Sequence, residues 1–315
     1  MSIKDFIQSF MHKTTVFHEG TYGIEIEAES KFPYDHPCLT HNSQGIPISG
    51  VKGDLTFWDV KEDGSLRFFG REYVLKVPLS YSDIGACLEE FKENTEKISF
   101  LEDSNSTSVH VHVNFLQESW KTLGNFFTLW TITENLMIEY SGEFRRNNLF
   151  CLPIRSVPYI NQLMIELLEK INKKYYNSIQ LLNSEVIKYS AINLSTLYKF
   201  GSIELRPFRG TTNISLIQDW VTLINHLLEY SRQDITPADI MEKVKSKGQG
   251  ILKDVFKADY KKIKHKNEKE LFFKNLIPAG RLGYSLSNDE WRKLDTIPKA
   301  KPKLKTSKKD LENWA

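Results

Sequence analysis

The chain has 315 residues, with 42 lysines and arginines against 40 aspartates and glutamates, so its formal net charge is +2. This length can bury one large core or two smaller ones, and the near-neutral charge gives no argument for nucleic acid or a membrane surface as a main partner. The three cysteines form no CxxC pair, which argues against a disulfide framework or a structural zinc site and favours a reducing, cytoplasmic location. No apolar run is long enough to span a bilayer, so no membrane partner is expected.

The first strongly patterned stretch is GIEIEAE at residues 23–29. In a strand, alternate side chains share a face, so Glu25, Glu27 and Glu29 lie together with apolar residues opposite. Like charges on one face repel each other, and a bound divalent cation removes that cost because such ions take carboxylate oxygens. An edge strand with an acidic outer face explains the pattern equally well when the stretch is taken alone.

A hairpin is predicted after a long loop at residues 33–53. Strands at 56–60 and 66–69 are joined by an Asp-Gly turn, and a further strand follows at 71–77. Asp63 in the turn and Glu72 after it could both reach toward the acidic strand. Acidic residues near turns are usually only solvated, so this signal is weak by itself.

The rest of the chain mixes helices with strands. Helices are expected at 84–98, 119–140, 161–171 and 214–228, the last one capped by Asn213, and strands at 108–115, 186–194 and 202–208. Because the order lacks regular βαβ alternation, we expect an α+β fold with a largely antiparallel sheet. We expect residues 1–232 to form one domain and residues 233–315 a helical, Lys-rich extension.

Two of the later strands repeat the alternation of the acidic stretch. In VHVHVN, three valines share one face, and His110, His112 and Asn114 share the other. Buried imidazoles bonded to the backbone are the structural alternative. In IELR, Glu204 and Arg206 point the same way, and an ion pair on the sheet surface is the alternative there.

Together the polar faces predict a metal-dependent site. Carboxylates with one imidazole suit Mg²⁺ or Mn²⁺ better than zinc, and clustered metals beside an arginine are what phosphoryl transfer needs. The chain has no GxxxxGK[ST] and no GxGxxG, so a nucleotide must be held by the sheet face and its metals. The groups expected to point inward are Glu25, Glu27, Asp63, Glu72, His110 and Glu204, with Arg206 beside them.

Five segments in this order carry a family resemblance: GIEIEAE, DGSL followed by GREYV, HVHVNF, EFRRNN and IELRPFRGTTN. Over roughly residues 22–220 the chain resembles the amidoligase family of carboxylate–amine ligases, within the glutamine synthetase and glutamate–cysteine ligase superfamily. That family occurs in bacteria and their phages. The resemblance implies a glutamine synthetase-like catalytic fold, with the active site on the polar face of the sheet and helices on the other face.

The resemblance also implies ATP and two or more Mg²⁺ or Mn²⁺ ions as cofactors. One ion, near the amine or acyl substrate, would be held by Glu27, Asp63 and Glu72. A second, which orients the nucleotide phosphates, would be held by Glu25, His110 and Glu204. His112 would then lie against a phosphate, and Arg206 would stabilise the γ-phosphoryl group in flight.

Arg145 and Arg146 follow the long helix predicted at 119–140. A guanidinium fork suits a phosphate or a substrate carboxylate, whereas surface arginines at a helix C-terminus are the alternative, which the helix dipole also favours. The resemblance favours a cofactor contact for one of them. Asn193 is a weaker candidate for lining the same site.

We therefore expect an ATP-dependent carboxylate–amine ligase with Arg206, Glu27 and Asp63 as catalytic residues. Mg-ATP would phosphorylate a substrate carboxylate, and an amine would attack the acyl phosphate to give an amide. The substrates would be small molecules or peptides in a bacterial or phage-infected cytoplasm, and nucleic acid is expected at most on the lysine-rich tail at 299–309. The alternatives are a metal-dependent phosphotransferase on the same fold and a non-catalytic nucleotide-sensing protein.

Overall fold

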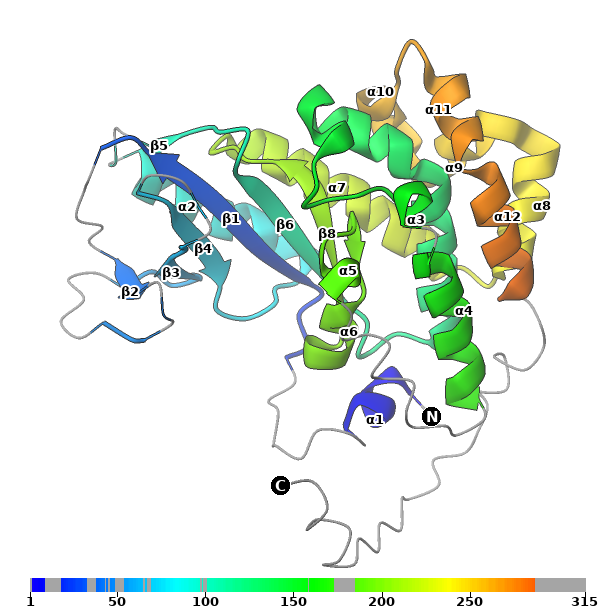
Figure 1. The fold of residues 1–315 in the computed structure, drawn as a ribbon, viewed down its shortest axis with the longest axis horizontal. Helices are drawn as coiled ribbons and strands as arrows, with labels where there is room; N and C mark the ends of the chain where they lie inside the picture. The colour runs from blue at the N-terminus through cyan, green and yellow to red at the C-terminus, as the bar shows by residue number, and fades with distance from the viewer. Residues whose placement is uncertain are drawn as a thin grey trace, which may run out of the picture.

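The structure is a computed structural model, in which an open, mostly antiparallel sheet carries helices against one of its faces (Figure 1). This arrangement confirms the predicted α+β class. The residues that it describes are 2–8, 18–32, 38–42, 44, 46–48, 54–64, 66, 69–96, 98, 101–157, 159–172 and 185–286. The lysine-rich tail at 299–309 lies outside them.

The strand order is β2-β3-β4-β1-β6-β8-β7, and β5 pairs with β1 off this path. The acidic strand β1 is therefore central, between β4 and β6, and it pairs antiparallel with both. The β2–β3 pair is parallel. The strands are β1 Tyr22–Ser30, β2 Leu39–His41, β3 Trp58–Glu62, β4 Arg71–Leu75, β5 Leu101–Glu102, β6 Ser108–Asn114, β7 Ile192–Asn193 and β8 Ser202–Arg209.

Helices precede, interrupt and follow the strands along the chain. The side chains of Ser119 and Asn213 cap α3 and α7 by accepting hydrogen bonds from backbone N–H groups of the first turn, as predicted for Asn213. The α-helices are α1 Ile3–Gln8, α2 Ile84–Thr95, α3 Trp120–Ser141, α4 Tyr159–Asn172, α5 Glu185–Lys188, α6 Ser195–Phe200, α7 Ile214–Ser231, α8 Pro237–Lys247, α9 Ile251–Phe256, α10 Tyr260–Ile263, α11 Glu268–Lys274 and α12 Leu276–Ser285. Two 3₁₀ turns, η2 Glu143–Asn147 and η3 Ile154–Ser156, follow α3.

The apolar face of the sheet packs on α3 and α7. Phe208 of β8 stacks on Trp220 of α7 with ring centroids 4.9 Å apart, and Trp130 of α3 meets Trp220 edge-on at 6.4 Å. On the β3–β4 side, Phe91 of α2 lies 4.9 Å from the ring of Tyr73. Large buried aromatic rings contribute much of the apolar area that stabilises such a core. One face of each strand is therefore committed to packing, and the other is left for polar groups.

The hairpin differs from the predicted one. β3 extends to Glu62 and pairs with β4 in the register Glu62 opposite Arg71, so the strand predicted at 66–69 is wrong. Leu66 and Phe69 lie in bends of the connection, and residues 67 and 68 lie outside the described part. A Cβ atom at Gly70 would come within 2.3 Å of the Leu66 side chain, so the connection folds back closely on itself there.

The strand predicted at 186–194 is also largely wrong. Residues 185–188 form α5, and only Ile192 and Asn193 pair with β8. The Ser190 hydroxyl donates a hydrogen bond to the Ile187 carbonyl oxygen at 2.6 Å and closes a turn between the two elements. Such a side-chain bond to nearby backbone competes with strand pairing.

The helices after residue 236 share one hydrophobic core with the sheet: α8, α10, α11 and α12 pack against α3, and α9 packs against α7. Buried amides support this contact: Asn275 donates to the Thr131 carbonyl oxygen at 2.9 Å, and Asn135 to that of Leu271 at 3.1 Å. The expected boundary at residue 232 stays a prediction. Among the helices that the structure describes, none is both long and apolar enough to cross a membrane.

Glu134 joins three of these elements from the middle of α3. Its fully buried carboxylate accepts hydrogen bonds from the Ile154 N–H at 2.9 Å and from the Asn275 and Trp130 side chains at 3.3 Å. Burial raises the pKa of Glu134 to about 8, although these donors and the charge of Arg155 lower it. The folded protein thus binds a proton here more tightly than the unfolded chain does.

Replacing Glu134 with glutamine should therefore change how stability depends on pH. The wild-type free energy of unfolding should fall as pH rises from about 4.5 to about 8, and Glu134→Gln should reduce that fall by roughly 2 to 4 kcal/mol. Urea unfolding at pH 5 and pH 9 measures this change, with Glu89→Gln on the exposed face of α2 as the control. Parallel pH dependences of the wild type and Glu134→Gln would show that Glu134 is ionised throughout.

Candidate metal centre

The strand register decides which polar groups of the sheet meet. Glu25 of β1 lies opposite His110 of β6, and Glu27 lies opposite Glu72 of β4. On the other side of β6, His112 lies opposite Glu204 of β8. Polar residues that are far apart in the sequence therefore form one continuous row across four strands.

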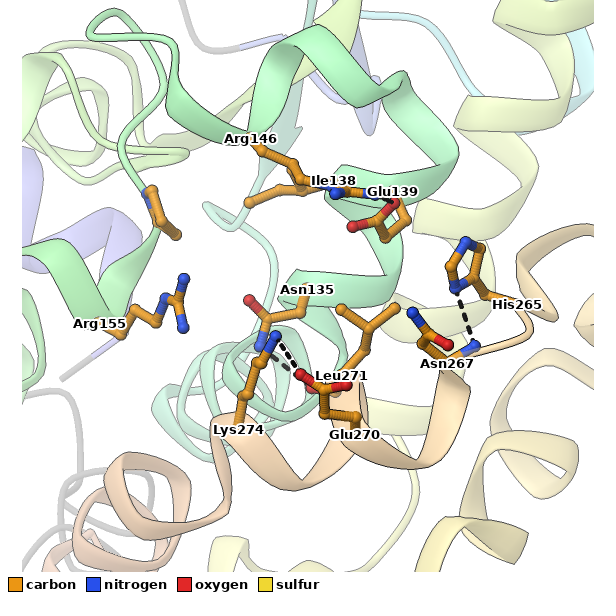
Figure 2. Close-up of a pocket in the computed structure, with 11 residues that line it drawn as sticks. Asn135, Ile138, Glu139, Arg146, Arg155, His265, Asn267, Glu270, Leu271 and Lys274 are labelled. Atoms are coloured by element: carbon orange, nitrogen blue, oxygen red, sulfur yellow. Dashed lines mark hydrogen bonds and ion pairs between the residues drawn. The ribbon is translucent and has the colours of Figure 1, made fainter.

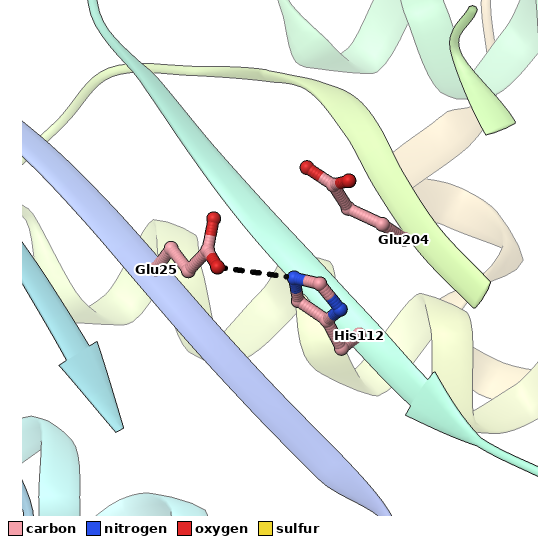
Figure 3. A group of neighbouring side chains, drawn as sticks. All are labelled: Glu25, His112 and Glu204. Atoms are coloured by element: carbon pink, nitrogen blue, oxygen red, sulfur yellow. Dashed lines mark ion pairs between the residues drawn. The ribbon is translucent and has the colours of Figure 1, made fainter. Parts of the chain in front are cut away.

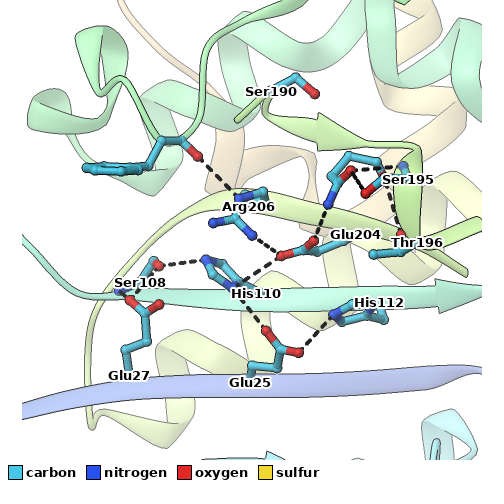
Figure 4. A network of polar contacts seen from close by, with 12 residues as sticks. Glu25, Glu27, Ser108, His110, His112, Ser190, Ser195, Thr196, Glu204 and Arg206 are labelled. Atoms are coloured by element: carbon cyan, nitrogen blue, oxygen red, sulfur yellow. Dashed lines mark hydrogen bonds and ion pairs between the residues drawn. The ribbon is translucent and has the colours of Figure 1, made fainter. Parts of the chain in front are cut away.

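The first cluster contains Glu25, His112 and Glu204, whose ligand atoms all lie within 4.8 Å of one another (Figure 3). Glu25 Oε1 is 3.2 Å from His112 Nε2. His110 belongs to the same place, because its Nδ1 lies 3.1 Å from Glu25 Oε2 and 3.3 Å from Glu204 Oε1 (Figure 4). We call these four residues the histidine cluster.

Charge holds the histidine cluster together. Burial raises the pKa of Glu25, but the charges of and hydrogen bonds from His112 and His110 outweigh it and hold that pKa well below its usual range. Burial lowers the pKa of His112, whereas the adjacent Glu25 carboxylate raises it to a net value above the ordinary one. In the absence of a metal, a proton on the imidazole thus balances the carboxylates, and a bound cation would displace it.

The second cluster contains Glu27, Asp63 and Glu72, again with ligand atoms within 4.8 Å of one another. We call it the carboxylate cluster. Burial and the charges of Glu25, Asp63 and Glu27 together raise the pKa of Glu72 to about 8. Three carboxylates with no imidazole are the donor set that a hard divalent cation prefers.

Ser108 joins the two clusters. Its backbone N–H and its hydroxyl both donate to Glu27 Oε2, at 2.7 and 2.8 Å, and the hydroxyl is also 2.7 Å from His110 Nε2. Since the single hydroxyl proton goes to Glu27, the His110 Nε2–H donates to Ser108. His110 Nδ1 then faces the Glu25 and Glu204 carboxylates, where either a proton that Glu25 accepts or a bound cation satisfies it.

Glu204 is held at both of its oxygens. Asn193 Nδ2 donates to Oε2 at 2.6 Å. The Arg206 guanidinium pairs with Oε1 (Figure 4). Arg206 Nε also donates to the Phe150 carbonyl oxygen at 3.2 Å. The structure therefore places Arg206 and Asn193 beside the histidine cluster.

Arg145 and Arg146, which the sequence suggests as a pair, lie in different surroundings. Arg145 is 2 % exposed, and its guanidinium donates to the carbonyl oxygens of Pro207 at 3.0 Å and Arg206 at 2.9 Å. Arg146 pairs with Glu139 on α3 and lines a different cavity. Arg145 holds the backbone that carries Arg206, and a cofactor contact of either arginine stays a prediction.

A cavity of about 260 Å³ opens beside the histidine cluster. Glu25 and His112 form one part of its wall, and apolar side chains, among them Pro78 and Phe200, form much of the rest. Gly23 lies opposite His112 on β1, where an added Cβ would come within 3.2 Å of the His112 Cβ. The small residue keeps space open next to the imidazole.

A family model described as “Putative amidoligase enzyme” matches residues 78–228. Over these residues, which are 151 of the 315, the chain is similar to the amidoligase family. The amidoligase match includes β6, α3, β8 and most of α7, and it therefore carries both histidines, Glu204 and Arg206. β1 and the β3–β4 hairpin, with the other four carboxylates of the clusters, precede it. No curated protein matches the chain.

The family match indicates a ligase-type enzyme. The two ligand clusters differ from the sequence-based expectation in two details. His112, which was expected against a phosphate, lies close enough to Glu25 and Glu204 to be a ligand itself. Ser108 was not predicted, although the alternation that selects His110 and His112 extends back to Ser108 on the same face. The ligand roles of all these residues stay predictions.

Glu72→Gln separates the folding cost of the carboxylate cluster from its metal binding. At pH 9 without metal, where Glu72 is ionised, the variant should be more stable than the wild type by roughly 1 to 3 kcal/mol, because burial and repulsion are relieved. With excess Mg²⁺ the stability difference between the variant and the wild type should narrow or reverse, because only the intact carboxylate cluster gains binding energy from the ion.

The measurement is chemical unfolding at pH 9 with EDTA and with Mg²⁺. Glu62→Gln, at the end of strand β3 of the same hairpin, is the control. Mg²⁺ should stabilise it as much as it stabilises the wild type. Equal Mg²⁺ stabilisation of the wild type and Glu72→Gln would argue against a metal in this cluster.

Proposed function

We propose that this protein is an ATP-dependent carboxylate–amine ligase with a glutamine synthetase-like catalytic site. The observation that carries the proposal is the row of two ligand clusters on one sheet face with Arg206 at its side. The amidoligase match supports the ligase class, and the donor types support the metals. We expect Mg²⁺ or Mn²⁺ rather than zinc, because oxygen donors predominate.

The residues present fit two cations. Glu27, Asp63 and Glu72 would hold one ion, and Glu25 and Glu204 with a histidine would hold the other. His110 presents Nδ1 to both carboxylates of the second site, and His112 contacts Glu25. When bound, these ions neutralise phosphate charge and so lower the barrier to phosphoryl transfer.

The reaction has two displacements. An oxygen of the substrate carboxylate attacks the γ-phosphorus of ATP, the bond to the β-phosphate oxygen breaks, and ADP leaves. The amine nitrogen then attacks the acyl phosphate carbon, phosphate leaves, and the nitrogen loses a proton to give the amide. Holding both reactants on one rigid sheet face converts the second step into a near-intramolecular one.

Arg206 would stabilise the charge on the phosphoryl group in transfer. Its guanidinium is anchored by Glu204 and the Phe150 carbonyl oxygen, and Arg145 fixes its backbone from the buried side. A donor held in this way needs no reorganisation when charge develops, which makes its interaction selective for the transition state. The apolar walls of the 260 Å³ cavity suit an uncharged part of a bound ligand. The substrates would be small or peptide carboxylates and amines, in the cytoplasm where ATP is available.

Arg206→Ala should lower the rate of ADP release by about 10³-fold while the fold is kept. Arg209→Ala is the matched control, since Arg209 lies on the same strand but contacts the Phe208 ring instead of the clusters. The assay couples ADP release to a panel of carboxylates and amines with Mg²⁺, and mass spectrometry identifies the product. Equal losses in both variants would remove Arg206 from the mechanism.

The product itself tests the reaction type. An amide formed together with ADP and phosphate is the expected result, and a stable phosphorylated product without an amide would favour the phosphotransferase. If no carboxylate and amine pair gave ADP release and Mg-ATP did not bind, the ligase proposal would be wrong.

A further inference from the structure

A second polar cavity lies among the helices, away from the two clusters. Its volume is about 130 Å³, and none of its lining residues belongs to a strand. The walls come from α3, η2, η3, α11 and the loop before α11 (Figure 2). The polar residues on which the argument rests are Glu139, Arg146, Arg155, His265, Glu270 and Lys274.

Positive charge exceeds negative charge on these walls. Arg146 pairs with Glu139, and Lys274 pairs with Glu270 at 2.7 Å. The third cation, Arg155, forms no ion pair within the described part of the chain. With three cations and two carboxylates, the cavity keeps an excess of one positive charge when His265 is neutral.

The donors approach the cavity from different sides. Figure 2 shows the guanidinium groups of Arg146 and Arg155 on separate walls and the Lys274 ammonium between them and α11. His265 Nδ1 accepts a hydrogen bond from the Asn267 N–H at 3.1 Å, so a neutral ring carries its proton on Nε2 and remains a donor. The site thus offers several N–H groups and one uncompensated charge.

We propose that this cavity binds a phosphate group, either as inorganic phosphate or as a small phosphomonoester. Guanidinium groups bind phosphate oxygens in bidentate fashion, and an anion supplies the negative counter-charge that Arg155 lacks. This site also gives a role to Arg146, which sequence reasoning selected for an anion and which the metal clusters do not use. The proposal does not depend on the ligase reaction.

Isothermal titration calorimetry in metal-free buffer tests the proposal, with inorganic phosphate and methyl phosphate as probes. The wild type should bind, Arg155→Gln should weaken binding at least ten-fold, and Arg155→Lys should retain part of it because charge is kept and the fork is lost. Tighter binding of methyl phosphate would identify a monoester as the ligand, and tighter binding of inorganic phosphate would identify the free ion.

Two control variants locate the site. Arg281→Gln removes an exposed arginine of α12 that does not line the cavity, and Arg206→Gln removes the arginine of the proposed active site. Both should bind phosphate as the wild type does. Absence of binding by the wild type, equal affinity in Arg155→Gln, or loss in Arg206→Gln would overturn the proposal. Urea unfolding of each variant confirms that a loss of binding is not a loss of fold.

Discussion

The placement of Glu27 directly opposite Glu72 is the constraint on which the rest of this structure depends. Two carboxylates on neighbouring strands, with Asp63 beside them, repel each other, and burial makes the ionised form of Glu72 still less favourable. The fold must supply that energy elsewhere. It does so through the opposite face of the same strands, where apolar side chains alternate with the acids and join the hydrophobic core, as Tyr73 of β4 does against Phe91 of α2. The alternation of the strands thus places the repelling carboxylates on one face and the stabilising apolar side chains on the other.

Support for the site comes mainly from groups outside the two clusters. Ser108 holds Glu27 and orients His110, and Asn193 holds Glu204. Arg145 donates to the carbonyl oxygens of Arg206 and Pro207. The β6–β8 register shifts in this region, which disrupts the ladder and leaves carbonyl oxygens that a buried guanidinium can satisfy. The register shift thus sets the position of Arg206, and the hydrogen bonds from Arg145 offset the cost of the lost ladder bonds.

Adjacent residues in a 3₁₀ turn need not share a function. Arg145 points into the core beneath β8, while Arg146 turns to α3 and lines the helical cavity. Between the two environments runs the segment that carries Phe150 and Ile154, whose backbone groups bind Arg206 and Glu134. The helical layer is thereby joined to the sheet through a short connection of hydrogen bonds.

The sequence by itself determined which residues face the site, because strand alternation is a local property that needs no knowledge of neighbours. It placed Glu25 and Glu27 with the histidines, Glu204 and Arg206 on polar faces, and its motifs indicated the amidoligase family. Only the tertiary structure decided which of these groups meet, since register depends on contacts between distant segments. Contacts between distant segments also placed Ser108 against Glu27 of the acidic strand and Arg145 against the backbone of β8, and strand alternation alone does not specify either contact.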